Sequence, residues 1–246
     1  MKKLLCLFLP LLLLTASIAI AGKDFWETKE YKEWAQKDCA KLLTDSPWAQ
    51  KFELTSVQVM DNSGNKTSTD GGQPYIRYGI QFRSALPVRQ AMVRQGQIAN
   101  KYESLSADQK QAFDKQASAM LDGFPTDSVV VNVSYATNDN DRDQELAQWW
   151  QTKTTELLKT QVYLTCGKTK VPIARYIAAQ GGSRSFQFIF PREVDGKPVI
   201  APQDKSIKLE FPYPAPDTGP LKGFGSGHAF QEFKTEKMVF AGNIAF

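Results

Sequence analysis

Two stretches rich in arginine and lysine are the part of this sequence best suited to binding a ligand. The first lies between Asp70 and Glu103 and the second between Glu156 and Glu193, and neither contains an acidic residue. If the strands that carry them are neighbours, the cations form a positive face. Such a face could hold an anionic polysaccharide or lipid head groups. The candidate binding residues are Arg77, Arg83, Arg175 and Arg184.

Acidic residues elsewhere in the chain offer an alternative, in which this face is neutral. Asp108, Asp114 and the run over residues 139–145 could fold back onto the cations and pair with them. Of the two alternatives we favour neutralisation, so ligand binding at the basic face is a hypothesis for the structure to examine.

Alternating carboxylates at residues 139–143 have the spacing of a calcium-binding loop. An EF-hand also needs Gly at its sixth position and Glu at its twelfth, where this chain has Gln144 and Trp150. Acidic residues at the start of a helix cap its N-terminus and complement its dipole. The sequence therefore predicts a helix cap here, and no metal site.

The thiols and the single histidine, His228, are the remaining candidates for nucleophilic chemistry. Cys39 and Cys166 could form a disulfide outside the cytoplasm. Alternatively they are two separate buried thiols, since Cys39 lies on the apolar stripe of a predicted helix. Neither cysteine has the helix-start or cationic setting that activates a thiol. Gly167-Lys168-Thr169 ends like a phosphate-binding loop but is followed by a predicted strand. We predict no catalytic residue and no cofactor.

The first residues of the chain have the pattern of a signal peptide. A basic start is followed by an apolar run over residues 4–20, and Ala19-Ile20-Ala21 fits a cleavage site. We therefore expect residues 1–21 to be a signal peptide and the protein to be exported, either to the periplasm or outside the cell. Residues 22–246 contain no second long apolar run, so we expect no transmembrane span in the mature chain.

Length and charge are those of one ordinary globular domain over residues 22–246. The formal net charge is +4, and two of these charges come from Lys2 and Lys3, which leaves +2. This excess is too small to indicate nucleic-acid binding.

The elements that must position these residues alternate between helical and strand patterns. Tyr31, Trp34, Cys39 and Leu42 share one face of a predicted helix over residues 29–43, and Ser46 with Pro47 is expected to start another. A polar loop is expected at residues 61–74.

Strands predominate in the rest of the chain, and their connections are too short for parallel crossovers. The sequence predicts an α+β fold, mainly an antiparallel sheet or sandwich with helices packed on one face. Strands are expected at 52–59, 75–84, 129–135, 162–166, 171–179, 186–190 and 207–211, with residues 228–233 and 237–246 forming a final hairpin.

Several segments together resemble a family of uncharacterised exported bacterial proteins. The pattern runs from Trp34 through the LLTDSPWA segment, residues 42–49, and continues with IARY at 173–176, FIFPRE at 188–193 and KMVFAGNIAF at 237–246. The resemblance covers most of the secreted chain. It implies export, and it implies no activity and no functional residue.

We therefore expect an exported, non-enzymatic module that binds a partner or associates with the cell envelope. The expected contact is the basic sheet face, and the expected partner is an anionic envelope component. Two alternatives stay open: a hydrolase that uses a pair of carboxylates, and a carrier that holds an apolar ligand between sheet and helices.

Overall fold

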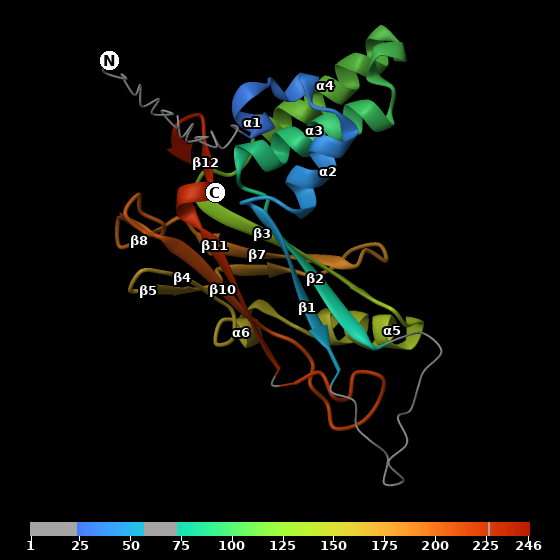
Figure 1. Cartoon of the computed structure of the whole chain (residues 1–246), viewed down its shortest axis with the longest axis vertical. Coiled ribbons are helices and arrows are strands. Elements are labelled where there is room, and N and C mark those ends of the chain that lie inside the picture. The colour runs from blue at the N-terminus through green and yellow to red at the C-terminus, as the bar shows by residue number, and fades with distance from the viewer. Residues whose placement is uncertain (1–23, 57–72, 226) are drawn as a thin grey trace, which may run out of the picture.

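The structure is a computed structural model of the chain, and it describes residues 24–56, 73–225 and 227–246. Two antiparallel sheets pack against each other, and helices lie near their ends (Figure 1). The fold is α+β, built on antiparallel sheets as the sequence predicts.

The first sheet has five strands, all paired antiparallel. Its order across the sheet is β1 (Ala49–Thr55), β2 (Tyr75–Phe82), β3 (Ser128–Thr137), β7 (Ser185–Pro191) and β6 (Arg175–Ile177). The alternating strand over residues 75–84 is confirmed as β2. The predicted strand at 171–179 is wrong as a single element, because β5 (Thr169–Pro172) and β6 belong to different sheets.

The second sheet has four strands, in the order β11 (His228–Lys234), β10 (Ser206–Pro212), β4 (Tyr163–Cys166) and β5. Two short hairpins complete the strands: β8 (Glu193–Val194) with β9 (Lys197–Pro198), and β12 (Val239–Phe240) with β13 (Asn243–Ile244). The expected hairpin between residues 228–233 and 237–246 is wrong, because β11 pairs with β10 and the C-terminal residues pair among themselves.

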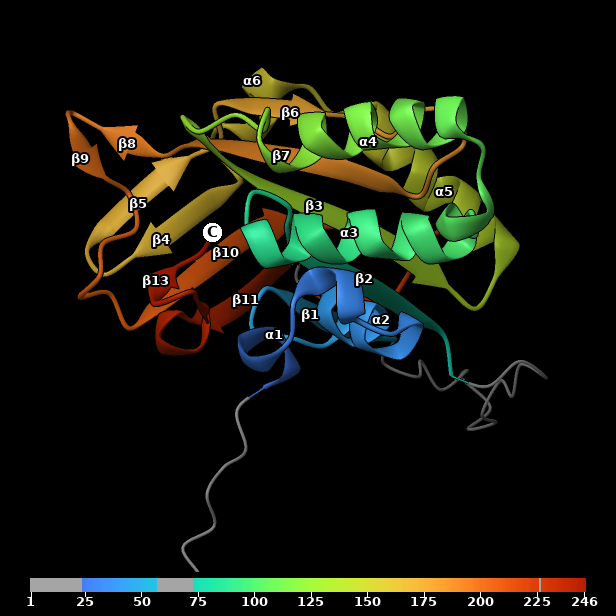
Figure 2. The ribbon, with the colours of Figure 1, turned by 90° about the horizontal axis from the view of Figure 1, so that it is seen from above.

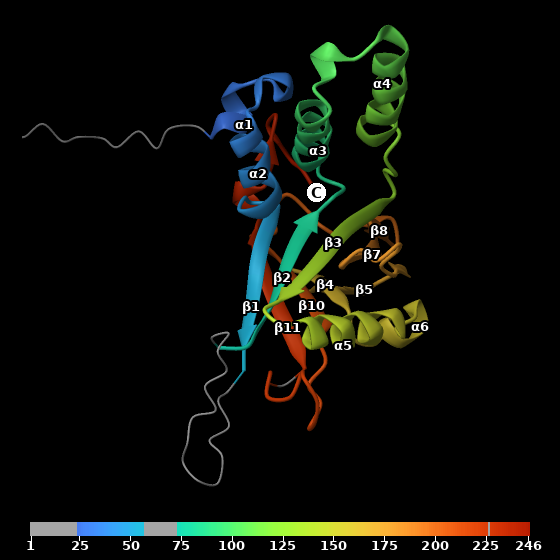
Figure 3. The same cartoon turned by 90° about the vertical axis from the view of Figure 1, so that its right-hand side faces the viewer.

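The helices gather at opposite ends of the sheets (Figure 3). At one end lie α1 (Phe25–Thr28), α2 (Gln36–Thr44), α3 (Leu86–Ala99) and α4 (Ala107–Leu121), and at the other lie α5 (Asn140–Gln151) and α6 (Thr155–Leu158). Three short 3₁₀ turns accompany them: η1 (Tyr31–Glu33), η2 (Tyr102–Ser104) and η3 (Thr235–Lys237). Viewed from the helical end, the five-stranded and four-stranded sheets lie beside each other (Figure 2).

Aromatic rings fill the space between the two sheets. Tyr78 and Phe188 of the first sheet contact Phe211 of the second, with ring centroids 5.3 and 6.0 Å apart. Trp150 of α5 adds a third layer, its ring 3.9 Å from that of Phe186. These rings are buried, and burying such large apolar areas is the main stabilising contribution to a fold of this kind.

The N-terminal segment is helical in pieces, and the prediction of one helix over residues 29–43 is wrong. The chain is extended at Lys29, Glu30 and Trp34, which separates α1, η1 and α2. This break lets the Phe25 ring meet the Trp34 ring at 5.6 Å, so tertiary packing overrides helix propensity. Trp34 and Leu42 are both buried, as the helical stripe predicts.

The predicted helix start at Ser46 and Pro47 is also wrong. The Ser46 hydroxyl accepts from the backbone N–H of Trp48 in a tight turn that leads into β1. The predicted signal peptide, and residues 61–72 of the predicted polar loop, lie outside the described residues.

Candidate functional site

The five-stranded sheet presents a polar surface on the side turned away from the second sheet. Side chains alternate along a strand, so the burial of Tyr78 and Phe82 in the core turns Arg77 and Gln81 outward. In Figure 3 this sheet lies in front of the four-stranded one. We call the outward side chains the polar face. Its charged and polar members are Lys51, Glu53, Thr55, Tyr75, Arg77, Gln81, Arg83, Asn132, Ser134, Arg175, Ser185 and Gln187.

Three of the four predicted binding residues share this face. Arg77 lies on β2, Arg83 directly follows β2, and Arg175 lies on β6. Arg83 and Arg175 belong to one row across the sheet. Arg83 is opposite Val130 of β3, Val130 is opposite Ile189 of β7, and Ile189 is opposite Arg175 of β6. Three strand spacings put the two about 14 Å apart, while Arg77 is six residues, about 20 Å, from Arg83. The cations are spread along the face, which suits a long ligand better than a small ion.

Arg77 is the one cation of this group with an acidic partner on the face. Its Nη2 lies 2.6 Å from Oε2 of Glu53, and its guanidinium stacks over the ring of Tyr75 at 4.8 Å. Glu53 is the only acidic side chain turned outward from these five strands, all of which are described. The pairing fixes the direction of the guanidinium and cancels its charge.

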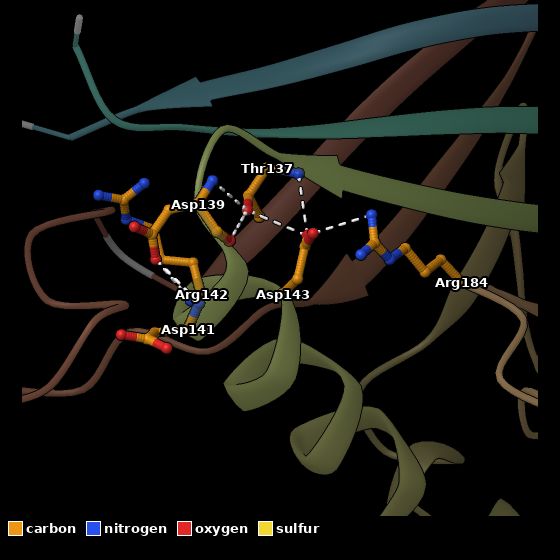
Figure 4. A network of polar contacts seen from close by, with 6 residues as sticks. All are labelled: Thr137, Asp139, Asp141, Arg142, Asp143 and Arg184. Atoms are coloured by element: carbon orange, nitrogen blue, oxygen red, sulfur yellow. Dashed lines mark hydrogen bonds and ion pairs between the residues drawn. The ribbon is translucent and has the colours of Figure 1, made fainter. Parts of the chain in front are cut away.

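Arg184, the fourth predicted residue, is neutralised by α5. Its Nη1 lies 2.8 Å from Oδ2 of Asp143, a nearly buried carboxylate. Asp143 Oδ1 also accepts from the backbone N–H and the hydroxyl of Thr137, at 3.1 and 3.0 Å (Figure 4). The favoured alternative of neutralisation by residues 139–145 therefore holds at Arg184, where the ion pair ties the start of β7 to α5.

The neighbouring Asp139 caps α5, so the acidic run supplies the helix cap, although the sequence pattern pointed to Asn140 or Asp141 as the capping residue. Its Oδ1 accepts from the N–H groups of Asp141 and Arg142, each at 3.0 Å (Figure 4). The hydrogen bond from Arg142 is the largest cause of the lowered pKa of the Asp139 carboxyl. Within the described part of the chain, no cluster of three or more His, Cys, Asp or Glu side chains is arranged to hold a metal ion.

Arg83, Lys51 and Arg175 make no ion pair with any described residue. Arg83 is partly covered, its Nε is fully buried without a hydrogen-bond partner, and burial lowers the pKa of its guanidinium. A buried donor without a partner costs free energy unless a ligand or water supplies one. The unpaired charge of the polar face therefore comes from these three side chains.

A hollow of about 190 Å³ opens in the polar face at Gly79, in the middle of β2. Gly79 lies between Lys51 of β1 and Ser134 of β3 in the strand register. A Cβ at this glycine would come within 2.7 Å of the Ser134 Oγ, so a side chain there would fill the hollow and displace its wall. Side chains that line it include Leu43, Thr44, Lys51, Arg77, Gln81, Asn132 and Ser134.

Two carboxamides stand side by side in this hollow. Gln81 and Asn132 are cross-strand partners, and the Gln81 Nε2 donates to the Leu43 carbonyl of α2 at 2.9 Å. Asn132 is only 7% exposed, yet its amide forms no hydrogen bond with a described residue. The oxygen and nitrogen of this amide are not among the fully buried polar atoms without a partner, so they are accessible from the hollow and available to a ligand or to water.

Sequence reasoning missed this hollow while finding the arginines around it. Lys51, Gln81, Asn132 and Ser134 lie on three strands whose register the sequence does not state. One signal was present: Gly79 interrupts an otherwise alternating strand, and a glycine inside a strand often marks the close approach of a ligand or another backbone.

The two cysteines are free and buried, so the structure favours separate thiols over the disulfide. Cys39 lies in α2 and Cys166 at the end of β4. Burial raises the pKa of both thiols, that of Cys166 to about 12, which makes them poor nucleophiles. His228 lies in β11, where its Nδ1 is 3.7 Å from Oε1 of Glu210.

A larger hollow, of about 520 Å³, lies beside the hairpin of β12 and β13. Its lining mixes apolar groups such as Ile244 with the carboxylates Asp204 and Glu236. Asp204 Oδ2 accepts from the backbone N–H of Ala201 at 2.8 Å, which gives this carboxylate a local structural role. The hollow is open and mixed in polarity, unlike the enclosed apolar cavity that a carrier needs.

Comparison with known proteins leaves the polar face to be interpreted from its own geometry. No family model matches the chain, and neither the curated proteins nor the solved structures contain a match. Among the described helices, none has the length and apolar character to cross a membrane.

Proposed function

We propose that this chain is an exported binding module whose polar face holds an anionic polysaccharide of the cell envelope. The observation that carries the proposal is the unpaired charge of Lys51, Arg83 and Arg175 on one sheet face. Glu53, the one outward carboxylate of the five strands, neutralises Arg77 alone. A spread of unpaired cations attracts a polyanion and steers its approach.

A polysaccharide fits this face better than a lipid surface does. Proteins that lie on membranes bury exposed apolar side chains among the lipids. The exposed large hydrophobic residues of the described chain are Leu157, Val194 and Phe230, and none of them belongs to the polar face. Carboxamides and hydroxyls, which match sugar hydroxyls, occupy the centre of the face instead.

Retention on immobilised polygalacturonate or heparin tests this proposal. The mature protein should be retained at low salt and eluted by modest salt, because counterion release and screening govern such contacts. A triple variant that removes these unpaired cations, Lys51→Gln with Arg83→Gln and Arg175→Gln, should pass through unretained. The matched control removes three outward cations from the other sheet: Lys170→Gln with Lys208→Gln and Lys234→Gln. It should be retained nearly as well as the natural protein.

Three outcomes would contradict the proposal. The natural protein could fail to bind at low salt, or the two triple variants could lose retention equally. Binding to vesicles of anionic phospholipid that is as tight as binding to polygalacturonate would instead identify a membrane surface as the partner.

A further inference from the structure

The hollow at Gly79 has the features of a specific site within the polar face. We propose that it takes one acidic sugar unit, a ring that carries a carboxylate beside its hydroxyls, and so gives the module its selectivity. This inference rests on the proposed function. It adds a recognised chemical unit to a face that would otherwise attract any polyanion.

Size limits the occupant to a single small unit. Pockets for drug-sized ligands measure about 300–1,000 Å³, whereas this hollow measures about 190 Å³. The absence of a side chain at Gly79 creates the space, because a Cβ there would lie 2.7 Å from the Ser134 Oγ.

The lining supplies groups that match hydroxyls. Asn132 contributes both a donor and an acceptor, and neither is used by a described residue. The Gln81 amide is oriented by its bond to the Leu43 carbonyl, which leaves its oxygen as an acceptor. An incoming ring with hydroxyls would form hydrogen bonds with these amide groups.

Charge makes the site selective for an acid. Lys51 lines the hollow without an ion-pair partner, while the Glu53 carboxylate holds the Arg77 guanidinium in place at its rim. A neutral sugar would leave the Lys51 ammonium without a counter-charge. A carboxylated sugar would pair with this exposed ammonium through charge-assisted hydrogen bonds, which are stronger than neutral ones.

Titration with single sugars tests the inference on the mature chain. Glucuronate should bind with a Kd in the millimolar range. Glucose and the methyl ester of glucuronate lack the carboxylate charge, so both should bind at least about tenfold more weakly. Glucose 6-sulfate is the second source of an anion. If it binds as well as glucuronate, the carboxylate assignment is overturned.

Two variants place the binding in the hollow. Asn132→Asp puts a repelling carboxylate there and should weaken glucuronate binding by about tenfold or more. Its matched control, Gln187→Glu, adds the same charge at the next position of the same row, on β7 and outside the hollow, and should weaken binding less than about threefold. Lys51 is exposed, so Lys51→Gln leaves the core intact and should also weaken glucuronate binding. It replaces Asn132→Asp in this test if urea denaturation shows that Asn132→Asp is unfolded.

The outcomes separate this inference from the proposed function. The protein could be retained on polygalacturonate without binding glucuronate, or Asn132→Asp could bind glucuronate as well as the natural protein does. Either result would show that the hollow is not the site, while the proposed function of the polar face would still hold. If neither polymer nor monomer binds, both fail.

Discussion

The outward sides of the two sheets carry similar numbers of charges but treat them differently. On the four-stranded sheet, Lys170 lies 2.8 Å from Glu210, and Lys208 lies 4.0 Å from Glu232. His228 also faces Glu210. We call this side the paired face. On the polar face, Lys51, Arg83 and Arg175 have no such partners among the described residues.

This contrast shows that cation content alone does not identify a binding surface. The paired face has lysines on three of its four strands, but their charge is largely satisfied by neighbouring carboxylates and by the Tyr163 ring, 4.0 Å from the Lys170 ammonium. Exposed pairs of this kind contribute little to stability. Their effect is to reduce the net positive field that a charged ligand would meet, although a hollow lined by Thr165 and Lys208 opens on this side too. The polar face differs in that its cations keep their field.

The largest expected difference between the two regions is in stability. Asp143→Ala removes a nearly buried acceptor from Thr137 and Arg184, and should lower the free energy of unfolding by about 1–3 kcal/mol. Glu210→Ala removes a carboxylate from a more exposed pair and should cost at most about 1 kcal/mol. Urea unfolding measures both. Equal losses would mean that the burial of Asp143 has no special weight.

The second prediction compares two substitutions that each release one cation. Glu53→Gln frees Arg77 on the polar face and should tighten binding to polygalacturonate about two- to fivefold, the worth of one exposed charge. Glu210→Gln frees Lys170 on the paired face and should change it less, because Lys208 beside it keeps Glu232 as its ion-pair partner and no described hollow is lined by Lys170. An equal gain from both variants would show that net charge, and not the arrangement of the polar face, sets the affinity.

Local sequence patterns predicted the fold class and many strands, because alternation in β2 and β10 and the capping run before α5 are short-range signals. They could not predict which strands pair. The outward position of Arg175 in the same row as Arg83 depends on β6 joining the first sheet, although β5, only three residues earlier, joins the second.

The hollow needed the same long-range information. Lys51, Gly79 and Ser134 come from three strands, and only their register brings them into one row. The broken N-terminal helix failed for a related reason. The partly buried Phe25 ring contacts the rings of Trp26 and Trp34, both in the core, and this packing outweighs the local periodicity that favours one helix.

The smallest expected effect uses the two buried cysteines as reporters of the two regions. Cys39 lies in α2, whose last residues, Leu43 and Thr44, line the hollow, while Cys166 lies beneath the paired face. Burial raises the pKa of both thiols, so at pH 8 alkylation of the native protein should require local opening. Glucuronate at a concentration near its Kd should slow alkylation of Cys39 about twofold, because a bound ligand stabilises the closed state by mass action. Cys166 should react at an unchanged rate, as followed by mass spectrometry of labelled peptides. Equal slowing at both cysteines would mean that the ligand stabilises the whole domain and that the hollow is not coupled to α2 in particular.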